Sequence, residues 1–277
     1  MAQITAKMVQ QLRERSGLPM MDCKKALEEV NGDETAAMEL LRKRGAAAAE
    51  KKAGRATSEG RIGSFVDPAK GVSVLVEMLC ETAPVANNPM FKEMADKIAA
   101  HAASAASKAD SATIADEVMA SGGTVRELLH DVLNRLRENI LIGRVYRRTG
   151  GGAAVYVHHT GKIGVSLVTE QPATNAELLN DVCMHIAAMH PDALTREQIS
   201  AELVAKEKEI ASEQIRASGK PENLIEKILV GKIDRWYSER VLLEQPFVKD
   251  DKQSVGKVLD AAKIKVTDFV RLQVGVG

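Results

Sequence analysis

Histidine and cysteine side chains are the first candidates for chemistry in this chain of 277 residues. They could ligate a metal ion or activate a nucleophile if their spacing brought them together. His158 and His159 are adjacent, so on a strand they point to opposite faces. His185 and His190 are five apart, which is a poor helical spacing for sharing an ion, and no cysteine has a histidine beside it in the sequence. The pattern predicts no metal site, no cofactor and no catalytic centre.

A phosphate-binding loop is the second kind of site that the sequence could offer. Gly219-Lys220 looks like the end of such a loop, but Gln214 stands where the motif needs glycine and Pro221 where it needs Ser or Thr. The three glycines at 150–152 precede a strand pattern, so they offer no helix N-terminus to a phosphate. We therefore expect no direct nucleotide binding, and binding to a partner is a better hypothesis than catalysis.

The composition narrows the class of partner and the compartment. There are 38 Lys+Arg and 38 Asp+Glu, whereas a non-specific nucleic-acid binder carries a basic excess. No apolar run approaches the roughly 18–20 residues that cross a bilayer, and the first residues lack the apolar core of a signal peptide. Cys23, Cys80 and Cys183 are far apart and odd in number, which is typical of reduced thiols. We expect a cytoplasmic protein that binds neither membrane nor nucleic acid.

The elements that must position a binding surface begin with three short helices in residues 1–45. We expect them at about 5–16, 21–30 and 33–45, because Gly17, Pro19, Asn31-Gly32 and Gly45 interrupt the apolar periodicity. Residues 46–60 hold no large apolar side chain and are predicted to be a linker, helical at its start and flexible after Gly54. Residues 1–45 therefore form a small module, and such modules usually bind something.

An internal repeat organises the rest of the chain into an α+β fold. GVSVLVE at 71–77 returns as GVSLVTE at 164–170, each in the second strand of a predicted hairpin. The strands are expected at 61–66 and 72–79, then at 154–158 and 163–168. Helices are expected at 91–101, 124–141 and 176–189, and a last strand at 265–274 could join the second sheet. This pattern predicts two core subdomains, 61–145 and 146–277.

Residues 196–240 interrupt the second subdomain with a predicted helical hairpin. Its first helix carries Ile199, Leu203 and Ile210, and a break at 218–221 precedes a second apolar helix. This pattern is typical of an antiparallel coiled-coil arm. Two alternatives remain open, since the arm either projects toward a partner or packs on the body of the protein.

The stretch LRERSGLPMMDCKKAL at 12–27 closely resembles the N-terminal signature of the bacterial elongation factor Ts family. LRKRG at 41–45, HIAA at 185–188, SGKP at 218–221 and QPFV at 245–248 extend the resemblance along the chain. That family is the guanine-nucleotide exchange factor of the GTPase elongation factor Tu. The resemblance implies a ubiquitin-associated-like three-helix domain, a two-subdomain core of small antiparallel sheets with helices, and an inserted coiled-coil hairpin. It implies no enzyme activity.

The resemblance also implies where the GTPase is bound. Met20 and Met21 would anchor the N-terminal module, although such residues could equally fill its core. In the second subdomain the family's contact region matches Ile163, Gly164 and His185, where a tolerated strand glycine and a hydrogen-bonded histidine are the alternatives. Weaker candidates by the same resemblance are Leu12, Arg13 and Cys23.

One loop departs from the family pattern. Thr82-Ala83-Pro84-Val85 stands where the family has Thr-Asp-Phe-Val, a loop understood to push into the GTPase near its magnesium site. Pro84 fixes its own backbone and restricts Ala83, so we expect a stiff loop. It would act as a rigid wedge with Val85 supplying bulk, or else be nearly silent.

A second function class stays open beside the exchange factor. An RNA-associated translation protein could use a local basic surface, and self-association is a further hypothesis. The lysines and arginines that would form this surface are Lys24, Lys25, Lys43, Arg44, Lys51, Lys52 and Arg55.

Overall fold

The computed structural model describes residues 3–172, 175–218 and 221–276, which form two compact units. Unit 1 contains the chain up to Ser64, Leu75–Tyr146 and the C-terminal residues from Gln273, and unit 2 contains Phe65–Val74 and Arg147–Leu272. Three helices come first, followed by small antiparallel sheets with helices, so the expected α+β class is confirmed. None of the helices in the described part of the chain has the length and apolarity to cross a membrane.

The N-terminal module consists of α1 (Ala6–Ser16), α2 (Met20–Glu29) and α3 (Glu34–Lys52). Thr5 and Asp33 cap α1 and α3 with side chains that accept backbone N–H groups, and Gly17 ends α1 in the left-handed region. The module core consists of Val9, Leu12, Cys23, Ala26, Leu27, Ala37 and Leu41.

The third helix does not end at Gly45, as the sequence suggested, but continues to Lys52 through the first half of the expected linker. Gly45 is buried against α6 (Val125–Leu136), and a Cβ there would lie 1.8 Å from Asn134 Nδ2. This glycine therefore permits close helix packing instead of ending the helix. The alanines that follow it are strong helix formers.

In the middle of the chain, β1 (Glu59–Asp67), β2 (Val72–Cys80) and β3 (Ile140–Thr149) form a sheet with β2 in the centre. Two helices follow β2, the single turn α4 (Ala83–Ala86) and α5 (Pro89–Ala103). The predicted helix 124–141 was too long. It ends at Leu136 because Arg137 adopts a left-handed φ of 64°, and β3 begins three residues later.

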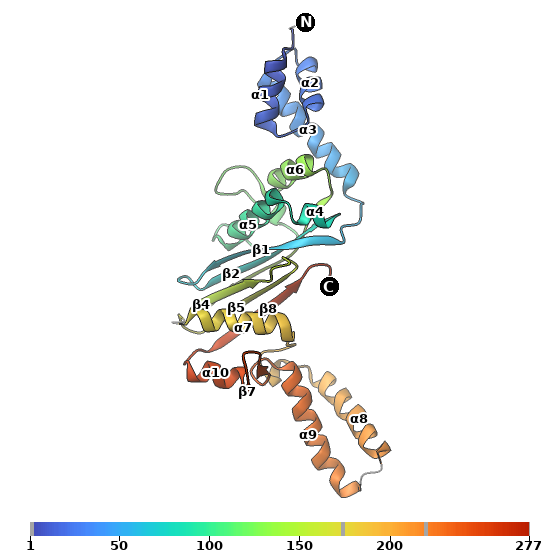
Figure 1. Ribbon diagram of the computed structural model, residues 1–277, viewed down its shortest axis with the longest axis vertical. Coiled ribbons are helices and arrows are strands. Elements are labelled where there is room, and N and C mark those ends of the chain that lie inside the picture. The colour runs from blue at the N-terminus through green and yellow to red at the C-terminus, as the bar shows by residue number, and fades with distance from the viewer. Residues whose placement is uncertain (1–2, 173–174, 219–220, 277) are drawn as a thin grey trace. The chain divides into compact units, whose positions relative to one another are not determined.

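Unit 2 is built on β4 (Gly152–Val157), β5 (Ile163–Thr169) and β8 (Val266–Gln273), covered by α7 (Ala176–Met189) (Figure 1). The strand order is β4-β5-β8, so the last strand does join the second sheet. After the arm the chain forms β6 (Pro246–Phe247), β7 (Asp250–Ser254) and α10 (Val255–Ala261), which the sequence did not predict. Their apolar residues complete the core under α7.

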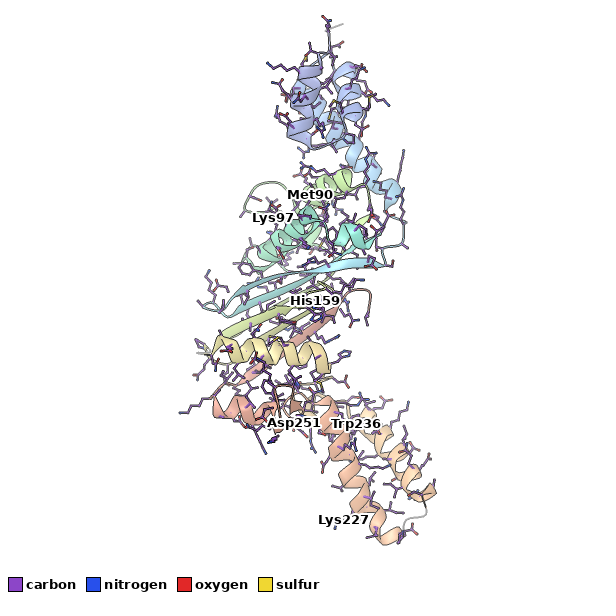
Figure 2. The ribbon with its side chains drawn as sticks, in the orientation of Figure 1. Met90, Lys97, His159, Lys227, Trp236 and Asp251 are labelled. Carbon is purple, nitrogen blue, oxygen red and sulfur yellow. The ribbon has the colours of Figure 1, made fainter. Side chains whose placement is uncertain are left out.

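The helical hairpin of unit 2 pairs α8 (Ala201–Ala217) with α9 (Glu222–Arg240), while Gly219 and Lys220 of the predicted break lie outside the described residues. Lys227 lies near its free end and Trp236 near its base (Figure 2). Ile199, which was expected on the first helix, lies before the start of α8. Leu203 and Ile210 are exposed, whereas Ala211 and Ile215 are buried. The base is held by Arg196, whose guanidinium contacts Glu244 at 2.5 and 2.6 Å and Asp234 at 2.9 Å.

Candidate partner-binding site

Met20 and Met21 are exposed side chains in the first turn of α2. They are 48% and 59% exposed, whereas Cys23, Ala26 and Leu27 on the same helix fill the module core. The sequence left open whether these methionines contact a partner or fill the core of the module. In the structure they lie outside that core. An exposed pair of flexible, polarisable side chains is well suited to contact an apolar patch on a partner.

Leu12 and Cys23 are completely buried, so a partner does not reach them in this conformation. Cys23 Sγ lies 3.4 Å from Ser16 Oγ and 3.8 Å from the carbonyl oxygen of Leu18. These contacts fix the turn that connects α1 to α2, directly before the methionine pair. Arg13 is exposed on α1, and its carbonyl accepts the N–H of Gly17 at 2.8 Å.

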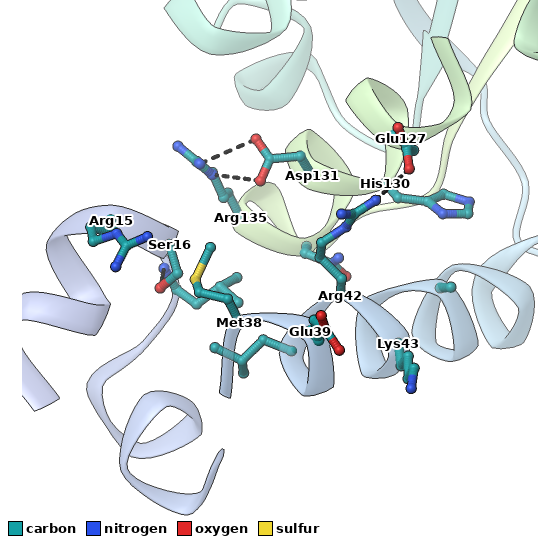
Figure 3. Close-up of a pocket in the computed structure, with 14 residues that line it drawn as sticks. Arg15, Ser16, Met38, Glu39, Arg42, Lys43, Glu127, His130, Asp131 and Arg135 are labelled. Atoms are coloured by element: carbon teal, nitrogen blue, oxygen red, sulfur yellow. Dashed lines mark hydrogen bonds and ion pairs between the residues drawn. The ribbon is translucent and has the colours of Figure 1, made fainter. Parts of the chain in front are cut away.

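A cavity of about 650 Å³, which the sequence did not predict, lies between the N-terminal module and α6 (Figure 3). Its lining carries both charge signs, and Arg42 of α3 pairs with Glu127 at the start of α6 across it. Burial, assisted by Arg126, lowers the pKa of His130 below its ordinary value. The ion pair between Arg42 and Glu127 joins the module to α6.

The Thr82–Val85 segment is a turn of helix, not an irregular loop. Thr82 is extended with φ −132° and ψ 152°, and α4 starts at the next residue. Pro84 lies in the first turn, where its missing N–H leaves no bond unmade. Thr82, Ala83 and Pro84 are exposed, while Val85 is half-buried. The outer surface of the turn is therefore formed by Thr82, Ala83 and Pro84.

The start of this turn is fixed by groups from the connection between α6 and β3. The N–H of Thr82 donates to Glu138 Oε2 at 2.9 Å, and the Thr82 hydroxyl donates to Glu138 Oε1 at 2.6 Å. Burial, together with the charge of Glu138, raises the pKa of Cys80 to about 11. The protonated thiol donates to the carbonyl oxygen of Thr82 at 3.3 Å.

In unit 2, Ile163 and Gly164 begin β5 directly after the turn of the β4–β5 hairpin. Gly164 pairs with Val157 and is buried, and Ile163 is half-buried against the unit 2 core. The carbonyl of Ile163 accepts the N–H of His158 at 2.9 Å, which closes the hairpin. Gly164 is therefore enclosed, and Ile163 exposes only part of its side chain.

His185 is completely buried on α7 and lies 5.9 Å from the Phe247 ring, centroid to centroid. Nε2 lies 2.8 Å from Gln245 Oε1, and Nδ1 accepts the N–H of Val248 at 3.2 Å. Gln245 is oriented by its own Nε2, which donates to the carbonyl of Glu239 at 2.9 Å. The network assigns the neutral tautomer with hydrogen on Nε2. Burial lowers the pKa of His185, although the bond to Gln245 opposes this shift.

Two residues of these networks escaped sequence reasoning for different reasons. Gln245 belongs to the QPFV stretch that carries the resemblance, so the sequence contained a signal for it. Glu138 lay inside the helix expected at 124–141, and nothing in the sequence marked it as a site residue. Within the described ranges, no group of three or more His, Cys, Asp or Glu side chains is suited to hold a metal ion.

Comparisons with known proteins address the family directly. The sequence model of the family described as Elongation factor TS matches residues 81–276. Elongation factor Ts of Methylococcus capsulatus is 44% identical over 276 residues, covering 99% of this chain and 93% of the relative. Elongation factor Ts of Renibacterium salmoninarum is 43% identical over 284 residues, covering 99% and 100% respectively. The chain therefore belongs to the elongation factor Ts family, the translation factors that act as nucleotide exchange factors for elongation factor Tu rather than as enzymes.

Proposed function

We propose that this chain binds elongation factor Tu·GDP and promotes GDP release by disturbing the magnesium and phosphate contacts, so that GTP can be loaded. The supporting observation is the exposed, proline-containing turn at Thr82–Val85, whose first residue is held by three hydrogen bonds to Glu138 and Cys80. An exchange factor needs no acid or base. It must bind the nucleotide-free GTPase better than the loaded one, because the coupling between nucleotide and factor is reciprocal.

The first anchor is the exposed methionine pair, Met20 and Met21. Both would enter an apolar patch of the GTPase, with Arg13 at the edge of the contact. Leu12 and Cys23 act indirectly, because they are buried and fix the geometry of the helix on which the methionines stand. We expect this anchor to determine affinity more than the rate of release.

The turn itself would act as a wedge at the magnesium-side edge of the GTPase. Ala83 and Pro84 offer no carboxylate and no ring, so the effect must come from the shape of a stiff backbone. The half-buried Val85 packs behind the wedge and contributes less bulk than the sequence suggested. A rigid turn loses little conformational entropy when it inserts, so more of its binding energy can oppose the nucleotide.

The second anchor would be the surface of unit 2 around Ile163 and Gly164. His185 supports it from inside by holding the N–H of Val248 and packing on Phe247. In finer organisation, we propose a ubiquitin-associated-like module at 1–45, a linker at 46–60 whose first part continues α3 to Lys52, and subdomains at 61–145 and 146–277. Residues 196–240 would form a coiled-coil arm inserted in the second subdomain, and the place of action is the cytoplasm.

Release of fluorescent GDP from elongation factor Tu tests the proposal. We expect release to accelerate with increasing amounts of this protein, to saturate, and to slow when excess magnesium is added. Calorimetry with GDP and the isolated protein should show no binding. Release that is unaffected by the protein at any concentration would refute the exchange mechanism.

A further inference from the structure

Glu138 is a carboxylate that holds the Thr82–Val85 turn from outside it. It follows Arg137, whose left-handed backbone ends α6 and turns the chain toward the end of β2. Glu138 is 56 residues away from Thr82 in the sequence, and its side chain is half-buried where the two segments meet.

Both oxygens of this carboxylate are occupied by the start of the proposed wedge. Oε2 accepts the N–H groups of Glu81 at 3.1 Å and Thr82 at 2.9 Å, and Oε1 accepts the Thr82 hydroxyl at 2.6 Å. Hydrogen bonds to an ionised acceptor are stronger than neutral ones, and three from two neighbouring residues fix a backbone direction. Glu138 thus fixes the backbone of Glu81 and Thr82, the two residues directly before α4.

Glu81 in turn accepts hydrogen bonds from the residue after Glu138 and from Arg55. The N–H of Asn139 donates to Glu81 Oε1 at 2.6 Å, and Arg55 Nη1 lies 3.3 Å from the same oxygen. The buried amide of Asn139 donates in turn to the carbonyl of Arg55 at 3.0 Å. The bond from Asn139 holds the pKa of Glu81 below its usual range, so Glu81 stays ionised in this network. Hydrogen bonds therefore join Arg55 to residues 81–82 and 138–139.

We propose that Glu138 is a positioning residue for nucleotide exchange, which fixes the direction in which the Thr82–Val85 turn leaves β2. This inference rests on the proposed function of that turn. Glu138 contacts the start of the turn through backbone N–H groups, so it works whatever side chains stand at 83 and 84. It needs no contact with the GTPase, and its loss lowers the rate of release rather than the affinity of the complex.

The test compares Glu138→Ala and Glu138→Gln with a control, Glu93→Ala, which removes an exposed carboxylate of the same unit that pairs with Lys97 at 2.7 Å. At saturating factor, Glu138→Ala should slow GDP release about tenfold, roughly 1.4 kcal/mol, with the half-saturating concentration within about twofold. Glu138→Gln keeps one acceptor oxygen and should lie between wild type and Glu138→Ala. The control should match wild type.

Backbone amide exchange of the free protein gives a readout that does not depend on the GTPase. The amides of Glu81 and Thr82 should lose protection in Glu138→Ala, and unchanged protection overturns the proposal. Lost protection with an unchanged saturated rate overturns it too. If Glu138→Ala does not fold, Thr82→Val removes only the hydroxyl bond and should slow saturated release about twofold to threefold. An inactive wild-type protein would refute the exchange function, and amide exchange would still decide whether Glu138 holds the turn.

Discussion

Met20 and Met21 project from α2 with about half of their surface exposed, whereas His185 is completely enclosed on α7. The family resemblance predicts partner contacts at both places. The methionines offer side-chain surface directly, on a helix whose other face keeps the module folded. His185 instead bonds to the N–H of Val248 and the side-chain oxygen of Gln245, so in the proposed function it acts on a partner only through the 245–248 segment.

This difference shows that a residue associated with binding can be an exposed contact or an enclosed residue that acts through its neighbours. An exposed contact residue changes affinity and leaves folding alone, since surface substitutions usually stay within about 0.5 kcal/mol. An enclosed residue changes folding first and binding as a consequence. Measuring both quantities on the same variant separates the two positions. Four experiments test the comparison, in order of decreasing expected effect.

His185→Ala should have the largest effect. It leaves a cavity in the unit 2 core and removes the partners of Gln245 Oε1 and the Val248 N–H. We expect a loss of about 3 kcal/mol in the free energy of unfolding, measured by urea titration. Exposed His159 serves as the control through His159→Ala. A variant that keeps its stability but loses affinity for elongation factor Tu would place His185 in direct contact and remove the contrast.

The double substitution Met20→Ala with Met21→Ala should come second. Loss of two apolar contacts should weaken binding to elongation factor Tu roughly thirtyfold, about 2 kcal/mol, with stability unchanged. Met189, 45% exposed on α7, gives the matched control Met189→Ala. A loss of stability instead of affinity would mean that the pair belongs to the core after all.

A pH titration of stability tests whether His185 is enclosed and neutral in the folded protein. Because burial lowers its pKa below the ordinary 6.5, the unfolded chain binds the proton more readily than the folded one. Stability should therefore be complete above about pH 6.5 and fall below it, by at most roughly 1.4 kcal/mol for each pH unit between the two pKa values. On α7, one turn before His185, the carboxylate of Asp181 pairs with Lys249 Nζ at 2.6 Å. Comparing the urea midpoints of wild type and His185→Gln between pH 7.5 and 5.5 isolates this contribution, and equal pH dependences would contradict it.

Pro84→Gly should have the smallest effect and tests whether exposed backbone can act like exposed side chains. A glycine loosens the first turn of α4, so GDP release at saturating factor should slow by about threefold, with complex formation unchanged. Pro84→Ala, which keeps helical preference, should lose less. Equal rates for all three proteins would favour a silent turn, with exchange coming from the unit 2 surface.

Much of the fold could be predicted from the sequence where short-range signals dominate. The helix expected at 176–189 has those bounds in the structure, since Asn175 caps it and His190 leaves it in a left-handed conformation. The hairpin expected around Ile163 and the last strand of the second sheet also follow from local alternation. Errors arose where a local signal had two meanings. Gly45 permits packing instead of ending a helix, and the α8 seam uses Ala211 where Ile210 was the more apolar choice.

The sequence by itself determined the family, the helix caps, the strand pattern and the position of the altered turn, because each depends on residues that lie close together along the chain. Only the tertiary structure decided which candidate residues are exposed and which are enclosed. It alone joined Glu138 to Thr82 and His185 to Gln245, pairs separated by 56 and 60 residues. Such pairs form when packed helices and strands bring distant segments within hydrogen-bond reach.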